Sequence, residues 1–102
     1  MAVTKEVVFE KYSWKLVKYY NDELDLYAVF FEKPDDEVKV NLIPDLGYTQ
    51  DNRQLIDHLR ISIDPTFFYG LNKFENYVTQ VQEAYDFAQE AWKWIEDNSF
   101  TK

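Results

Sequence analysis

The order of apolar and polar residues divides this chain into an alternating N-terminal part and a helical C-terminal part. Between residues 6 and 43, apolar side chains alternate with polar ones, which is the period of a half-buried β-strand. From about residue 73 to 97 they recur at three- and four-residue steps, the period of an amphipathic helix. The pattern therefore predicts an α+β fold, with a sheet followed by one long helix that packs on one sheet face.

Two turn signals divide the alternating part into three antiparallel strands, at about 6–20, 24–33 and 37–43. Asn21-Asp22 predicts the first turn, and Lys33-Pro34-Asp35-Asp36 has proline at the second position, as type I turns favour. We expect consecutive strands to pair as a meander. The upstream residues 6–10 are expected to extend the first strand or to form a short edge strand.

This register places nine large apolar side chains on one face of the sheet, and a slip of one residue would turn all of them to the other face. The three rows are Tyr12–Phe31–Val38, Trp14–Val29–Val40 and Leu16–Tyr27–Leu42. Opposite charges also face each other, at about 0.2–1 kcal/mol a pair. These pairs are Lys18–Asp25, Lys11–Glu32 and Glu10–Lys33. The other face is apolar at one end, around Val17, Leu26 and Ile43, and needs cover from the middle segment or from a partner.

Residues 44–71 give a weaker pattern. Asp51 and the polar residues after it can cap a short helix near 52–59, with Leu55 and Ile56 turned inward. Alternation in the following segment favours a fourth strand at 59–63. The aromatic residues at 67–69 are expected to close one end of the core.

The composition supports a single compact domain that spans residues 1–102. The 102 residues are 46% apolar and 19% aromatic, which is ample for one core and atypical of disordered chains. Cysteine is absent, so disulfides and thiolate sites are excluded. The sequence shows neither a signal-peptide pattern nor an apolar run of about 18 residues, so we expect a cytoplasmic protein without a membrane partner.

The formal net charge of −8 narrows the class of partner. Proteins that bind nucleic acid derive most of their affinity from cationic side chains that neutralise phosphates, so direct binding to DNA or RNA is disfavoured. A basic protein surface would be attracted instead. The alternative is that the charge only keeps the protein soluble.

One side of the predicted helix combines carboxylates with two large aromatic residues. The acidic residues fall within an arc of about 80° on a helical wheel, and two aromatic residues seven positions apart border that arc. Exposed aromatic residues beside charge are typical of interface hot spots. We therefore expect the partner-binding residues to be Glu75, Glu83, Asp86, Phe87, Glu90, Trp94 and Asp97. An ordinary solvated face, with both aromatic residues buried, is the alternative.

No motif in the sequence indicates catalysis, a metal or a cofactor. His58 is the only histidine and is expected at the surface, since imidazole metal sites need more than one. The acidic run 35–37 lacks the spacing of a Ca²⁺ loop, and no phosphate-binding or nucleophile motif is present. We expect a non-enzymatic protein.

The leading hypothesis is an acidic interaction module that binds a basic protein. If that partner binds nucleic acid, the carboxylates would mimic phosphates and the chain would act as a competitive inhibitor. In size and charge the chain is similar to the small acidic inhibitors of defence nucleases made by phages and mobile elements. The alternatives are a small-ligand-binding domain and a homo-oligomeric structural domain, including a homodimer through an open sheet edge.

Overall fold

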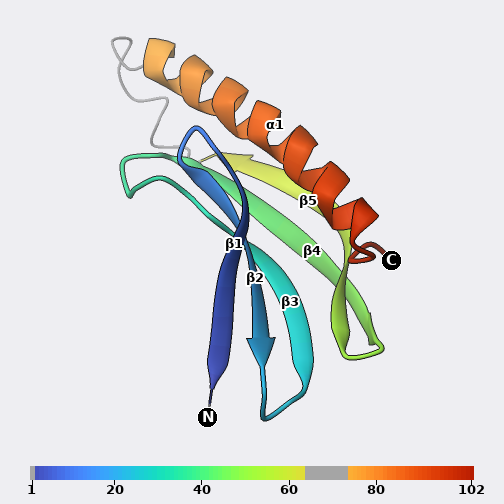
Figure 1. Ribbon diagram of the computed structural model, residues 1–102. Coiled ribbons are helices and arrows are strands. Elements are labelled where there is room, and N and C mark those ends of the chain that lie inside the picture. The colour runs from blue at the N-terminus through green and yellow to red at the C-terminus, as the bar shows by residue number, and fades with distance from the viewer. Residues whose placement is uncertain (1, 64–73) are drawn as a thin grey trace.

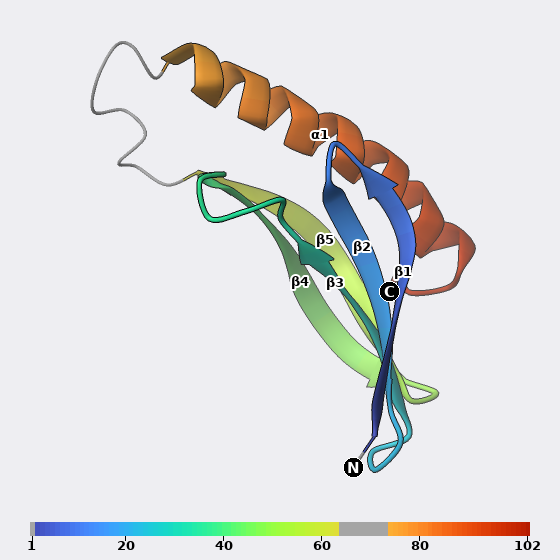
Figure 2. The same ribbon diagram turned by 60° about the vertical axis from the view of Figure 1, so that its left-hand side comes forward.

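The protein is a two-layer α+β structure in which one long helix covers one face of a five-stranded sheet. A computed structural model describes residues 2–63 and 74–102, except the side chains of residues 48–50 and 74–76. Figures 1 and 2 show the helix running across the sheet, whose far end projects beyond it toward the N-terminus. The elements are β1 (Val3–Lys11), β2 (Trp14–Asn21), β3 (Leu26–Glu32), β4 (Val40–Gln50), β5 (Arg53–Ile63) and α1 (Phe74–Asp97). The α+β prediction is confirmed.

The sheet is mixed rather than a meander. Its strand order is β1-β2-β3-β5-β4, and the single contact between β3 and β5 is parallel, at Tyr27 and Arg53. The predicted pairing of 24–33 with 37–43 is therefore wrong, and so are the three rows built on it. The segment from 37 to 43 contributes instead to the longer strand β4, which pairs with β5 along almost its whole length.

The predicted short helix at 52–59 is also wrong, because these residues belong to β5. Asp51 and Asn52 have positive φ angles of 52° and 61° and connect β4 to β5. A two-residue hairpin turn of this kind favours Asp and Asn because they tolerate positive φ. A helix N-cap favours the same residues because their side-chain oxygens accept bonds from the first N–H groups of the helix, so the sequence alone fitted both structures. The predicted strand at 59–63 is confirmed as the end of β5.

The predicted first strand, 6–20, folds into two strands at Tyr12 and Ser13. Their φ angles of 55° and 63° form a tight turn, so β1 becomes an edge strand antiparallel to β2. Neither residue is typical of such a turn, since left-handed backbone costs a residue with a Cβ about 1–2 kcal/mol. The sequence around Tyr12 and Ser13 does not indicate a turn. The turn is stabilised instead by contacts of Lys11 and Tyr12 with α1, which are described below.

The β2–β3 register differs by four residues from the predicted one. Leu16 lies opposite Phe31, because the loop takes four residues rather than two. The side-chain oxygen of Asn21 accepts hydrogen bonds from the N–H groups of Glu23 (3.0 Å) and Leu24 (3.2 Å), which stabilises the wider loop. An even shift keeps every residue on its predicted face.

The predicted charge pairs are replaced by others with the same complementarity. In place of Lys18–Asp25, Lys11–Glu32 and Glu10–Lys33, the register sets Lys15 between Glu10 and Glu32, and Lys18 opposite Glu6.

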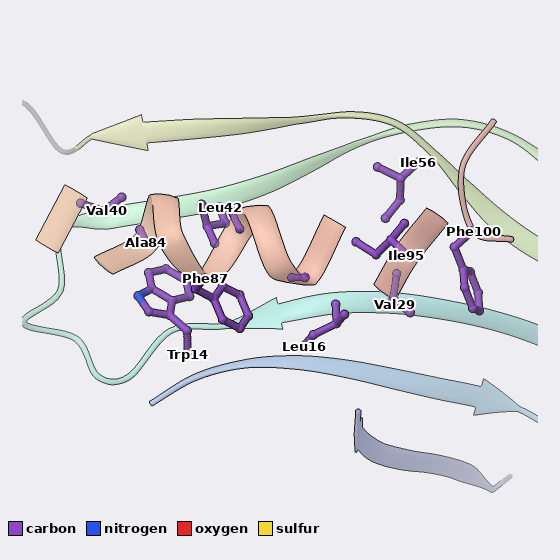
Figure 3. Packing of buried hydrophobic residues seen from close by; sticks show 12 residues of the cluster. Trp14, Leu16, Val29, Val40, Leu42, Ile56, Ala84, Phe87, Ile95 and Phe100 are labelled. Atoms are coloured by element: carbon purple, nitrogen blue, oxygen red, sulfur yellow. The ribbon is translucent and has the colours of Figure 1, made fainter. Parts of the chain in front are cut away.

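The core forms where α1 crosses the sheet (Figure 3). Among the nine predicted face residues, five are buried in the core and two pack partly against it. The buried five are Trp14, Leu16, Val29, Val40 and Leu42. Phe31 and Val38 are the partly buried pair, whereas Tyr12 and Tyr27 are exposed. The hydrophobic face was therefore predicted correctly, although its rows were not.

On the second sheet face, for which the sequence left cover by the middle segment or by a partner open, side chains of the sheet itself bury Val17 and Ala28. Val17 and Ala28 lie on this face and are 2% and 1% exposed. Their cross-strand partners are Phe30 and Tyr19, whose rings contact each other at 5.8 Å, and the Lys5 ammonium lies 5.6 Å from the Phe30 ring. The middle segment instead extends the sheet as β4 and β5.

The helix at 73–97 is confirmed almost residue for residue. Its C-terminus closes as a Schellman motif with Ser99 in the left-handed conformation (φ 64°). The N–H of Phe100 donates to Ile95 O (3.0 Å) and the N–H of Ser99 donates to Glu96 O (3.1 Å). This turn directs the last residues back along β5. The aromatic residues at 67–69, which the sequence places at one end of the core, lie outside the described residues.

Candidate functional site

The helix α1 is strongly acidic. The helix has six acidic residues and one basic residue, Lys93, so 24 residues carry a net charge of −5. Glu90 and Asp97 are exposed, and Glu83 and Asp86 are half-buried. The side chain of Glu75 lies outside the described residues. From Glu83 to Asp97 these carboxylates form a strip about 21 Å long on the helix.

Two of these carboxylates hold the β1–β2 turn against the helix. Glu90 forms an ion pair with the ammonium of Lys11 at 2.5 Å, and Asp86 accepts a 3.4 Å hydrogen bond from the Tyr12 hydroxyl. The hydrogen bond to Glu90 raises the pKa of Lys11 above its ordinary value. Asp86 and Glu90 therefore have a structural role, and Glu83 and Asp97 are the predicted strip residues without a described bond.

Phe87 and Trp94 occupy different environments. Phe87 is fully buried and stacks on Phe9 (5.5 Å) and Trp14 (5.8 Å). This buried position corresponds to the alternative that the sequence left open for Phe87. Trp94 is half-buried and stacks on Phe100 at 5.9 Å, which leaves only part of its ring at the surface.

A largely apolar groove of about 400 Å³ runs between α1 and β5. Leu59 and Ile61 form its β5 side, and Tyr85 and Trp92 are among the residues of its helix side. Ile61 is 40% exposed and Tyr85 is 46% exposed. Tyr85 and Trp92 both belong to the apolar side of the helical pattern. In the sequence, the only indication of the groove is the width of the apolar side of the helix. This side is too wide for one sheet face to cover completely.

A more polar cavity of about 600 Å³ lies at the end of the sheet that α1 leaves uncovered, between Tyr27 and Arg53. Arg53 is already engaged there: its Nη1 donates to Asn98 O at 2.6 Å, and its guanidinium lies 5.0 Å from the Phe100 ring. A cation at a helix C-terminus satisfies a free carbonyl and the helix dipole. Arg53 therefore anchors the C-terminus of α1.

The same end of the sheet carries a hydrogen-bonded tyrosine. Tyr20 donates from its hydroxyl to Asp25 at 3.0 Å, and that carboxylate raises the pKa of Tyr20 above its ordinary value. Asn52 binds the second oxygen of Asp25 at 2.9 Å. These contacts join the β2–β3 loop to the β4–β5 turn, so they have a structural explanation.

His58 lies at the surface, as expected, in a cluster with Asp45 and Arg60. Arg60 Nε donates to Asp45 Oδ2 at 2.6 Å, and His58 Nε2 lies 2.7 Å from the same oxygen. The Arg60 hydrogen bond lowers the pKa of Asp45, and His58 adds to the effect. The cluster is open to solvent and joins two paired strands, so it resembles a cross-strand bridge rather than an acid–base pair.

Within residues 2–63 and 74–102, no three histidine or acidic side chains come together as metal ligands would. The one described helix is too polar to cross a membrane. No protein-family model, curated protein or solved structure matches this chain. The function must therefore be argued from the surface itself, where the acidic strip and the α1–β5 groove are the two unusual features.

Proposed function

We propose that this protein is an interaction module that binds a basic protein through the acidic side of α1. The net charge of −5 on one helix supports this, because it concentrates most of the whole chain's −8 on a single element. A concentrated field of this kind attracts a cationic surface and speeds its encounter.

The placement of the charges argues against solubility as their sole role. The last turn of α1 contains Glu96 and Asp97 and no basic residue. Carboxylates at this end oppose the helix dipole, where a cation would stabilise the helix by about 0.3–1 kcal/mol. The guanidinium of Arg53 on β5 compensates part of this cost at Asn98 O, but within the helix the last turn retains carboxylates where a basic residue would be more stable.

The finer form of the proposal is that the partner binds nucleic acid and that the carboxylates take the place of phosphates. A phosphate-binding surface recognises spaced negative charges, and the strip supplies them along about 21 Å between Glu83 and Asp97. Under this form the protein competes with DNA or RNA for the partner. A short nucleic-acid duplex would then displace the protein from the complex.

The test is affinity capture from a lysate of the native host by the immobilised protein, at about 0.05 M and 0.5 M salt. The reversal variant Glu83→Lys/Asp97→Lys changes the strip without touching the bonds of Asp86 and Glu90. Its matched control, Glu23→Lys/Asp36→Lys, changes the charge equally but outside α1, in the β2–β3 and β3–β4 loops. The proposal predicts a basic protein that is captured at low salt, released at high salt and lost only with the reversal variant. Equal capture by both variants would overturn it.

A further inference from the structure

The β5 strand has a backbone edge that the described structure leaves unpaired along the groove. On the side away from β4, β5 contacts β3 at Arg53 and the C-terminal segment at Ile56. From residue 57 to 63 no further strand partner occurs on that side among the described residues. Figures 1 and 2 show β5 next to α1 with β4 on its other side. Alternate N–H and C=O groups of this edge therefore have no strand partner among the described residues.

The C-terminal segment shows how this edge accepts a chain. The N–H of Ile56 donates to Phe100 O at 2.7 Å, and the N–H of Lys102 donates to Ile56 O at 3.3 Å. Thr101 thereby forms a parallel bridge with Ile56. An extended segment running in the same direction, one step further along, would lie beside residues 58–62 and directly against the groove.

We propose that the α1–β5 groove binds an extended basic peptide of a partner protein, which adds to β5 as a parallel strand. In this binding mode main-chain hydrogen bonds supply affinity, and alternate side chains supply specificity. Every second peptide residue is apolar and enters between Ile61 and the rings of Tyr85 and Trp92. The intervening residues are Lys or Arg and face solvent near Glu96; Lys93 also lines the groove, so the attraction comes from the net charge of α1 as a whole. This inference deepens the proposed function by naming where and how the partner binds. That the partner is basic rests on the proposed function.

Charge decides between a foreign peptide and a second copy of this chain. Two copies joined along β5 would bring two helices of net charge −5 next to one another. Like charges at an interface oppose association, whereas a cationic peptide gains from the same field. The groove therefore suits a basic peptide better than it suits a second copy.

The experiment uses an array of about eight-residue peptides in which Val, Leu, Ile or Phe alternates with Lys, Arg or Thr. The best binder is then titrated against the full chain by fluorescence anisotropy, in three backbone forms. The first peptide has an unmodified backbone. The second is N-methylated at its odd-numbered residues, and the third is N-methylated at its even-numbered residues. We expect one methylated form to lose at least about tenfold in affinity and the other to bind almost normally, because alternate N–H groups face the strand.

Variants of the protein locate the site. Ile61→Asp and Tyr85→Ala, both at exposed positions, should each weaken binding by about tenfold or more. Leu24→Asp, at an exposed apolar position in the β2–β3 loop, is the matched control and should bind normally. Circular dichroism confirms that each variant remains folded.

Three results would overturn the inference: no array peptide binds, both methylated forms bind equally, or sedimentation shows a dimer that Ile61→Asp dissociates. Failure of the proposed function looks different. In that case peptides still bind in the methylation-dependent way, but Lys and Arg give no advantage over Thr. If the captured partner instead responds to the strip variant and not to Ile61→Asp, the function stands and the groove assignment fails.

Discussion

Phe87 of α1 stacks on Trp14 of β2 with their ring centroids 5.8 Å apart and their planes at 25°. Phe9 stacks on the same phenyl ring, and Phe31 meets it edge-on at 6.0 Å. Three strands therefore contact one helical side chain. This cluster fixes the rotation of α1 about its axis, and with it the direction in which the carboxylates point.

Truncation of this ring should be severely destabilising. Phe87→Ala leaves a cavity among three aromatic side chains, and we expect it to lower the free energy of unfolding by about 3–5 kcal/mol. Urea denaturation followed by tryptophan fluorescence measures the change. Tyr85→Ala, at an exposed position two residues earlier, should cost about 1 kcal/mol or less. Similar losses in the two variants would contradict the observed rotation of the helix.

The left-handed backbone at Ser99 gives a stabilising prediction. Glycine adopts φ near 64° without the cost of about 1 kcal/mol that a Cβ carries there, and it is the usual residue at this position of a Schellman motif. Ser99→Gly should therefore raise the free energy of unfolding by up to about 1 kcal/mol, and Tm by about 4–8 °C. Thr101→Gly is the control, and stabilisation there instead would refute the assigned cap.

Removal of the C-terminal anchor should loosen the end of α1. Arg53→Ala loses the bond to Asn98 O and the contact with the Phe100 ring, with an expected cost of about 1–2 kcal/mol. Amide hydrogen exchange should show faster exchange near residues 95–102 and little change in β1. Uniform acceleration over the whole chain would mean that Arg53 supports the fold globally instead.

The Asp45 cluster predicts a pH dependence with a definite sign. The folded-state pKa of Asp45 lies below the ordinary 3.8, so its contribution is complete above that value and is lost as pH falls through the folded pKa. The stability difference between wild type and Asp45→Asn should therefore be present at pH 7 and vanish in acid. Asp57→Asn, an exposed carboxylate on β5, is the control. A difference that grows as the pH falls would contradict the Arg60 pairing.

The sequence predicted the sheet faces well and the strand pairing poorly. Alternation placed Trp14, Leu16 and Val29 correctly, because the β2–β3 register moved by an even number of residues. Pairing depended on turn lengths, and the turn at Tyr12-Ser13 carries no local signal. Its conformation depends on the bonds of Lys11 and Tyr12 to a helix more than 70 residues away.

The candidate site was predictable only in part. The acidic strip follows from helical periodicity alone, so Glu83 and Asp97 were found at the surface. The environment of Phe87 depends on three strands of the sheet, which a helical wheel does not represent. Prediction of the groove also requires the packing of α1 on the sheet, because the rotation of the helix determines that Tyr85 and Trp92 lie beside β5.

The most direct test of the account is the salt dependence of the captured complex, measured by isothermal titration calorimetry with purified partner. The acidic strip predicts that affinity falls steeply as salt rises. It also predicts that Glu83→Lys/Asp97→Lys weakens binding by about tenfold or more at low salt and flattens the salt dependence. An affinity that is indifferent to salt, and equal for this variant and the Glu23→Lys/Asp36→Lys control, would contradict a role of α1 in binding a basic protein.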